Sequence, residues 1–167
     1  MRFLRNLLIS RALKSHSTAL VYKGWKNFKT VQILSDQPLE TNKELNDLVK
    51  MLENEGRNVQ LLNYNDIKKP KEGGAAQTYY STDVSYLGRP KKAVFGIFNP
   101  NTDVLIDWTV AEESPNDFLS ANSNSGFKIG IGRSLPCFDF TVKLSQESKD
   151  QVTNEILKYL KMINHDG

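Results

Sequence analysis

The chain has 167 residues, of which 39% are hydrophobic and 25% are charged, and its formal net charge is +3. This length and composition are typical of one globular domain with a single hydrophobic core. No apolar run approaches the roughly 18 residues that a membrane-spanning helix needs, so no transmembrane segment is predicted.

The charge is distributed unevenly along the chain. Seven of the 22 basic residues precede Asp36, and all 19 acidic residues lie at or after that position. A basic segment attached to a mildly acidic body favours contact with something anionic. The pattern therefore predicts a basic helical arm over residues 1–30 and a single α/β domain over residues 31–167.

Residues 2–15 are predicted to be helical. Their apolar residues share one face for two turns, and two cations continue the same stripe: Phe3, Leu4, Leu7 and Leu8, then Arg11 and Lys14. Two interpretations remain open, namely a helix packed on the domain with its basic end in solvent, or an arm that binds an anionic surface. An Arg-rich, acid-free leader is also the composition of an organellar transit peptide.

A strand–helix–strand unit follows the arm. Val31–Ser35 is a short apolar strand, and Thr41 with Glu44 forms a T-x-x-E capping box at the start of a helix that Gly56 ends. Asn58–Leu62 is the next strand. Two strands joined by one helix are expected to lie parallel in the same sheet.

The stretch from Thr102 to Gly132 has the same organisation. Val104–Asp107 is an apolar strand, Ser114-Pro115 begins a short helix, and Phe127–Ile131 is the next strand. A unit of this kind requires a sheet with both faces covered.

The remaining segments are less regular. Phe138–Leu144 is a last strand, and Ser148 with Gln151 opens an amphipathic closing helix. Between Tyr64 and Lys92 lies a long irregular segment, whose tyrosines favour covering the sheet edge over stacking on bases. Ala93–Phe98 fits either a strand or a short helix.

Together these signals predict a three-layer α/β domain. Its mostly parallel sheet has about five strands in the doubly wound, Rossmann-like arrangement, and a basic N-terminal helix precedes it.

Several short sequence segments, and the order in which they occur along the chain, resemble a family of small bacterial α/β proteins known only as a domain of unknown function. They are the phrase from Tyr79 to Pro90, the strand Asp103–Asp107, Phe127-Lys128-Ile129-Gly130 and the closing helix. The resemblance covers nearly the whole chain after the arm and implies that Ala93–Phe98 is helical. A fainter, fold-level likeness to the acceptor-side half of heptosyltransferase-type glycosyltransferases implies a sheet topology rather than a reaction.

The chain has few residues of the kinds that bind metals or act as nucleophiles. His16 and His165 are the only histidines and Cys137 is the only cysteine, so neither a metal site nor a cofactor is predicted. Cys137 is interpreted as a packed thiol rather than a nucleophile. The lone cysteine also favours a reducing compartment.

A small-molecule site, if there is one, is expected at the carboxyl ends of the strands, where open α/β sheets bind ligands. The candidate ligand-binding residues there are Asp36, Thr109, Glu112, Ser114 and Arg133. Glu112 is equally well explained as a solvated loop acid, and the glycines around Arg133 as a simple turn rather than a phosphate cradle.

Two functions are therefore predicted. The first is a non-catalytic cytoplasmic accessory or scaffold protein, peripheral to a membrane or large complex, whose arm docks on an anionic protein, nucleic acid or membrane surface. The residues assigned to that contact are Arg2, Arg5, Arg11 and Lys14. The alternative is a small nucleotide- or sugar-phosphate-binding enzyme that uses the rim of the sheet. Burial of the early arginines against carboxylates of the same molecule would argue against a free arm.

Overall fold

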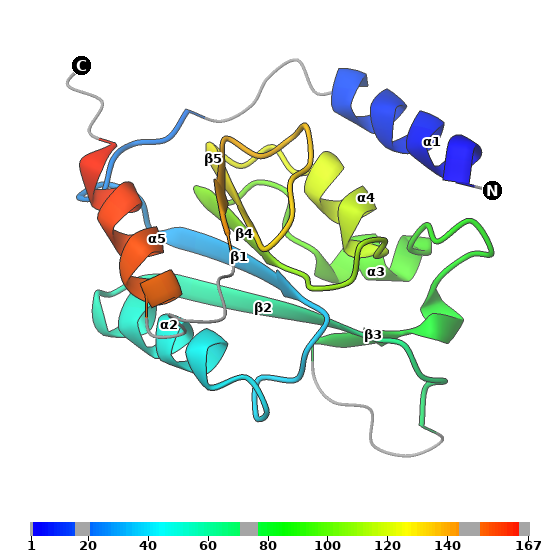
Figure 1. The fold of residues 1–167 in the computed structure, drawn as a ribbon, viewed down its shortest axis with the longest axis horizontal. Coiled ribbons are helices and arrows are strands. Elements are labelled where there is room, and N and C mark those ends of the chain that lie inside the picture. The colour runs from blue at the N-terminus through cyan, green and yellow to red at the C-terminus, as the bar shows by residue number, and fades with distance from the viewer. Residues whose placement is uncertain (1, 16–20, 71–76, 144–150, 164–167) are drawn as a thin grey trace.

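The computed structural model describes residues 2–15, 21–70, 77–143 and 151–163, and Figure 1 shows their arrangement. The strands are β1 (Thr30–Ser35), β2 (Asn58–Asn65), β3 (Thr78–Tyr80), β4 (Val104–Trp108), β5 (Phe127–Ile131) and β6 (Phe140–Val142). The helices are α1 (Arg2–Ser15), α2 (Lys43–Asn54), α3 (Lys92–Ile97), α4 (Asn116–Ala121) and α5 (Gln151–Met162).

The six strands form one parallel sheet in the order β3-β2-β1-β4-β5-β6. The chain builds outward from β1 to β3, returns to place β4 beside β1, and then builds outward to β6. This is the doubly wound order, and its direction reverses between β1 and β4. The predicted fold class is confirmed, with six strands rather than five.

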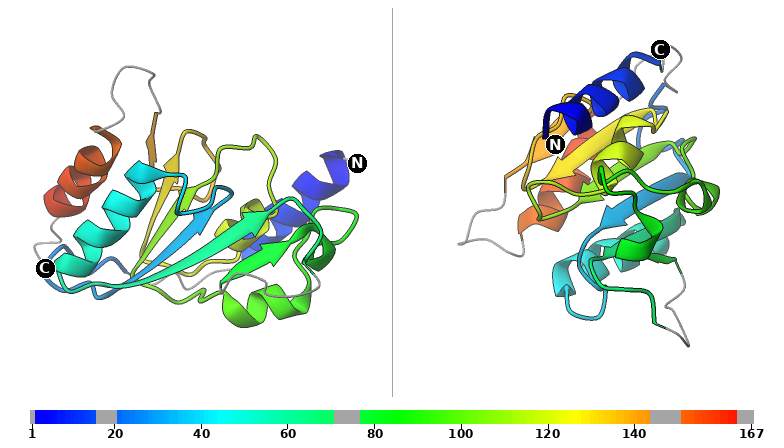
Figure 2. Two further views of the ribbon diagram at one scale, coloured as in Figure 1. Left: turned by 90° about the horizontal axis from the view of Figure 1, so that it is seen from below. Right: turned by 90° about the vertical axis from the view of Figure 1, so that its right-hand side faces the viewer.

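Helices cover both faces of the sheet (Figure 2). The larger core lies under α2 and α5, where Val31, Ile33, Val104, Ile106 and Ile129 point from the strands. The smaller core lies on the opposite face, under α3 and α4. Alternate residues of each central strand are thus buried on opposite faces, which explains why these strands are continuous apolar runs.

The segment from residue 21 to residue 29 is part of the larger core. Tyr22 and Phe28 are buried in it, and Arg57 donates hydrogen bonds to the carbonyl oxygens of Trp25 and Phe28. The larger core thus includes residues that precede the predicted boundary at residue 30.

Helix α1 forms a fourth layer on the outside of α4 (Figures 1 and 2). Ile9 is buried in a small cluster with Phe118 and Ala121 of α4. The arm is thus packed on the domain, as the first of the two interpretations expected.

The caps of α2 differ slightly from the prediction. Its N-cap is Asn42, whose Oδ1 accepts a hydrogen bond from the Leu45 amide at 3.0 Å. Thr41 instead donates its hydroxyl to the Pro38 carbonyl. At the other end Gly56 has φ +76°, the left-handed conformation predicted for it.

The irregular segment contains a strand that the sequence did not indicate. β3 is only three residues long and pairs with the end of β2, and both of its tyrosines are buried. Tyr79 and Tyr80 thus cover the sheet edge as part of a strand, whereas Tyr86, the third tyrosine of that prediction, is exposed to solvent. Ala93–Phe98 is largely the helix α3, as the family resemblance implied.

At the other edge, β6 is shorter than the predicted strand. Ser148, in the predicted capping box before α5, lies outside the described residues. Among the described residues, none of the helices combines the length and the apolar character required to cross a bilayer.

Candidate functional site

A chain of buried charged side chains crosses the carboxyl end of the sheet. Arg133, in the loop after β5, places Nη2 3.0 Å from Oδ2 of Asp107 on β4, and its Nη1 pairs with Asp117 of α4. The other oxygen of Asp117 pairs with Arg5 of α1. All four side chains are at most 11% exposed. The network therefore links four elements that are far apart in the sequence.

Asp107 is the most deeply buried member of this network. Its Oδ2 also accepts a hydrogen bond from the Ser120 hydroxyl, with 2.6 Å between the two oxygens. Burial raises the pKa of this carboxyl above its usual value, and the Arg133 guanidinium opposes that rise. For Arg133, burial lowers the pKa, but Asp107 and Asp117 outweigh it and the pKa is raised. The network thus keeps Arg133 charged in a nearly dry environment.

The crevice between β1 and β4 is occupied by Asn116. Its amide nitrogen donates to the Ser35 carbonyl at 3.1 Å and to Oγ1 of Thr109 at 3.0 Å, and its amide oxygen accepts the Tyr79 hydroxyl at 2.6 Å. Ligands of doubly wound sheets commonly bind at this switch point. Here a side chain of the chain itself connects the strands across it.

The five predicted rim residues have different environments. Thr109, Ser114 and Arg133 all belong to the buried polar network. Asp36 accepts hydrogen bonds from the amides of Val110 and Ala111 and so holds the adjacent loop.

Glu112, the fifth, is exposed in that loop.

Sequence reasoning did not find Asn116 and Asp117, because a short polar helix start gives no sign of what it will contact. Asp107 did carry a signal, since it is an acid at the end of an apolar strand.

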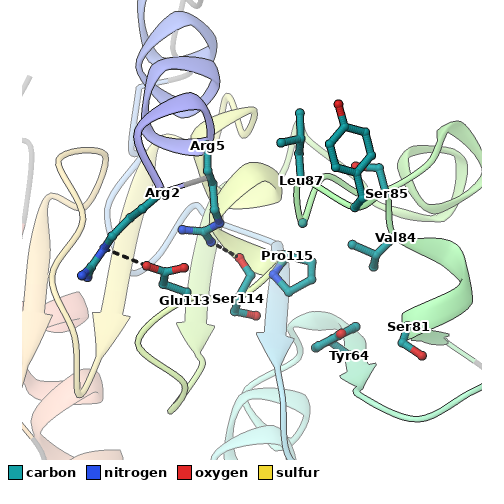
Figure 3. A pocket seen from close by; sticks show the side chains of 12 residues that line it. Arg2, Arg5, Tyr64, Ser81, Val84, Ser85, Leu87, Glu113, Ser114 and Pro115 are labelled. Carbon is teal, nitrogen blue, oxygen red and sulfur yellow. Dashed lines mark hydrogen bonds and ion pairs between the residues drawn. The ribbon is translucent and has the colours of Figure 1, made fainter.

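A pocket of about 410 Å³ opens beside this network (Figure 3). Arg2 and Arg5 reach it from α1, and Tyr64 and Ser81 lie on its far side. Nε of Arg2 pairs with Glu113 at 2.8 Å, and Nη2 of Arg5 donates to the Ser114 carbonyl at 2.7 Å. Both arginines thus already have partners within the chain.

Comparison with known proteins identifies the family. The model of a family of unknown function (DUF6913) matches residues 2–163. The chain belongs to DUF6913. No curated protein and no solved structure matched it, so the fainter likeness to heptosyltransferase-type enzymes stays a prediction.

The DUF6913 match begins at the first residue of α1, although the resemblance seen in the sequence began only after the arm. This helix is therefore part of the family's domain.

The cations assigned to an anionic partner divide into two pairs. Arg5 is buried against Asp117, and Arg2 pairs with Glu113 at the surface. The prediction that these two residues are free for a partner thus differs from the structure. Arg11 and Lys14 are exposed, and their binding to an anion stays a prediction.

Large apolar residues lie on both sides of α1, and three of them face outward. Phe3, Leu4 and Leu7 are 77%, 51% and 38% exposed, whereas Arg5 and Ile9 face the domain. The helix is thus attached through Arg5 and Ile9, with Leu8, Ala12 and Leu13 partly buried beside them, while the outer residues of its apolar stripe meet solvent. Single exposed apolar residues are ordinary, whereas here three lie on one side of a short helix.

Beside this patch lies a basic groove of about 310 Å³. Arg11 of α1 and Arg89, from the loop before α3, line it together with Leu8 and with Phe118 from α4. The opposite flank of α1 is different, because both acids and arginines line a pocket there: Glu112, Glu113 and Asp117 with Arg2 and Arg5. Two of these acids are paired with the two arginines, so this flank is not basic.

Cys137 lies half-buried in the loop before β6. Burial raises the pKa of its thiol to about 12, against the opposing effect of Lys128. A thiol of this kind is a poor nucleophile at neutral pH. Across the described ranges, no group of three His, Cys, Asp or Glu side chains is arranged to hold a metal ion. His16 and His165 lie outside those ranges.

Proposed function

We propose that this chain is a non-catalytic accessory protein of the cytoplasm that docks on an anionic partner through α1. The single observation that carries the proposal is the outward direction of the α1 stripe, where Phe3, Leu4 and Leu7 are exposed in line with Arg11 and Lys14. Burying such a patch on a partner is favourable, and the adjacent cations select a partner of negative charge.

The inner side of the helix supports the same proposal. Arg5 is buried in a hydrogen-bonded ion pair with Asp117, and it also donates to the Ser114 carbonyl. These contacts fix the rotation of α1 about its own axis. A surface held in place before binding loses less conformational entropy when a partner arrives.

The body is proposed to act as a scaffold. Asn116 fills the crevice where a ligand of this fold would approach, and Arg133 is paired with two carboxylates. Asn116 and the guanidinium nitrogens Nη1 and Nη2 of Arg133 therefore hold elements together, whereas Nε of Arg133 and Oδ1 of Asp107 are buried with no hydrogen-bond partner in the described part of the chain.

The proposal is tested by sedimentation of the full chain from a cell lysate. We expect the chain to pellet with a large partner at low salt and to be released as salt screens the contact. Arg11→Glu with Lys14→Glu should abolish pelleting, whereas Lys50→Glu with Lys92→Glu, two exposed lysines on other helices, should not. Equal recovery of all three proteins in the supernatant at low salt would overturn it.

The alternative is a small nucleotide- or sugar-phosphate-binding enzyme, and the pocket in Figure 3 is the observation that favours it. A thermal-shift screen of the full chain against nucleotides and sugar phosphates tests this function. A ligand at 100 times its Kd stabilises the folded state by about 2.7 kcal/mol, which gives a visible rise in Tm. An unchanged Tm across the panel would contradict it.

A further inference from the structure

We propose that the anionic partner is a lipid bilayer, on whose surface α1 lies flat. This inference rests on the proposed docking function and names its partner class. The helix is the outermost layer of the molecule on its side (Figure 2), and its exposed side chains Phe3, Leu4 and Leu7 are here called the ridge. A bilayer accommodates such a ridge without a preformed groove, because its headgroups and acyl chains rearrange around the inserted side chains.

The ridge places three large apolar side chains in solvent, where a bilayer could bury them. Phe3 is 77% exposed at the start of the helix, and Leu4 and Leu7 follow it on the same side. Tyr86, which is 82% exposed, projects from the loop that lines the pocket beside Arg2 and Arg5. Aromatic and leucine side chains of this kind are favoured at the boundary between headgroups and acyl chains.

The basic groove supplies sites for lipid phosphates. Arg11 and Arg89 line it together, and a guanidinium pairs well with the oxygens of a phosphate. Lys14 continues the basic side by one turn. On the opposite flank Glu113 is paired with Arg2 and Glu112 is exposed, so the helix should tilt its Arg11 side toward the membrane.

A lipid surface fits this patch better than nucleic acid does. Leucine side chains neither pair with phosphates nor stack on bases, whereas single-stranded nucleic acid is bound mainly by cations and aromatic rings. Burial of Leu4 and Leu7 in hydrocarbon instead gives these exposed residues a favourable environment.

The experiment is flotation of the purified full chain with vesicles. One set contains phosphatidylcholine alone, and the other contains phosphatidylcholine mixed with phosphatidylglycerol. We expect binding to the mixed vesicles at low salt, and much weaker binding to the neutral ones. Absence of binding to the mixed vesicles would overturn the lipid assignment.

Two double variants separate the apolar and the charge contributions. Phe3→Ser with Leu7→Ser, and Arg11→Gln with Arg89→Gln, should each weaken binding to mixed vesicles by about tenfold or more. The matched controls are Met51→Ser with Ile97→Ser, and Lys50→Gln with Lys92→Gln, all at exposed positions on other helices. These controls should bind as the unaltered chain does. Equal losses in test and control variants would contradict a role for α1.

A fluorescence measurement of membrane insertion tests the proposal without variants that could lose binding because they unfold. Phe3→Trp places a fluorophore at the start of the ridge, and quenching by brominated acyl chains should be stronger for this variant than for the unaltered chain. Quenching that is equal in the two proteins would show that α1 does not insert. If the chain pellets from lysate through α1 but does not bind vesicles, the proposal of docking through α1 is supported and the assignment of a lipid partner is overturned. If the chain neither pellets nor binds vesicles, both proposals are overturned.

Discussion

Asp103 shows how one carboxylate aligns two strands. Its Oδ2 accepts hydrogen bonds from the Lys29 and Thr30 amides and from the Thr30 hydroxyl, all within 2.8–2.9 Å. Partial burial raises the pKa of Asp103, but these bonds outweigh it and hold the pKa below the ordinary 3.8. The residue thus connects the beginning of β4 to the beginning of β1.

We predict that Asp103→Asn lowers the free energy of unfolding by roughly 1–3 kcal/mol near neutral pH, because hydrogen bonds to an ionised acceptor are lost. A carboxyl whose pKa is lower in the folded state than in the unfolded state stabilises the folded state at pH values above its unfolded-state pKa. That stabilisation is lost as the pH falls through the folded-state pKa. The variant and the unaltered chain should therefore converge in acid. Urea titrations at neutral pH and below about pH 3 measure this, and a constant difference between the two proteins would contradict it.

Cys137 gives a second prediction for a single residue. Since burial raises the pKa of this thiol to about 12, almost no thiolate is present at neutral pH. We expect a disulfide reagent such as Ellman's reagent to label the folded chain slowly and the urea-unfolded chain rapidly. Rapid labelling of the folded chain would indicate an activated cysteine and reopen the question of catalysis.

At the scale of the element, the end of α2 depends on the conformation of Gly56. A Cβ at this position would meet no heavy atom within 4 Å, so a substitution there tests backbone strain alone. We predict that Gly56→Ala destabilises the chain by about 1–2 kcal/mol, the cost of a left-handed residue with a side chain. Thermal unfolding measures the change.

Gly96, within α3, is the matched control for that substitution. It also has open space around a Cβ, but its φ is not positive. Gly96→Ala should stabilise the chain by about 0.5–1 kcal/mol through the higher helix propensity of alanine. The prediction for Gly56 would be contradicted if the two variants changed stability in the same direction.

At the scale of the whole molecule, the buried network attaches α1 to the sheet. We predict that Arg5→Met lowers the free energy of unfolding by about 3–5 kcal/mol, because Asp117 loses one of its two cationic partners in a buried site. Amides of α1 should then exchange with deuterium faster, while those of β1 should change less.

Arg2→Met is the control for this prediction, since the Arg2–Glu113 pair is largely exposed and should contribute at most about 1 kcal/mol. Unchanged exchange in the α1 of Arg5→Met would show that Ile9 and its apolar neighbours hold the helix without the network.

Local sequence patterns were enough to predict the central strands of the sheet and most of the helices. The β1–α2–β2 and β4–α4–β5 units were predictable because apolar runs, capping residues and glycine stops are local patterns. β3 was not, since three residues are too few to show a period, and their strand conformation depends on pairing with β2. At the candidate site, Asp36, Thr109, Ser114 and Arg133 were identified by their position after strands, but their partners were not.

The direction in which α1 faces depends on contacts that are distant in sequence. The sequence predicted the helix and its stripe of Phe3, Leu4, Leu7 and Leu8, but left open whether the helix packs on the domain. The inward side is set by Arg5, whose partner Asp117 is 112 positions away, and by the apolar contacts of Ile9 with α4. No local pattern contains the pairing of charges so distant in sequence, and that pairing fixes which surface the molecule presents to a partner.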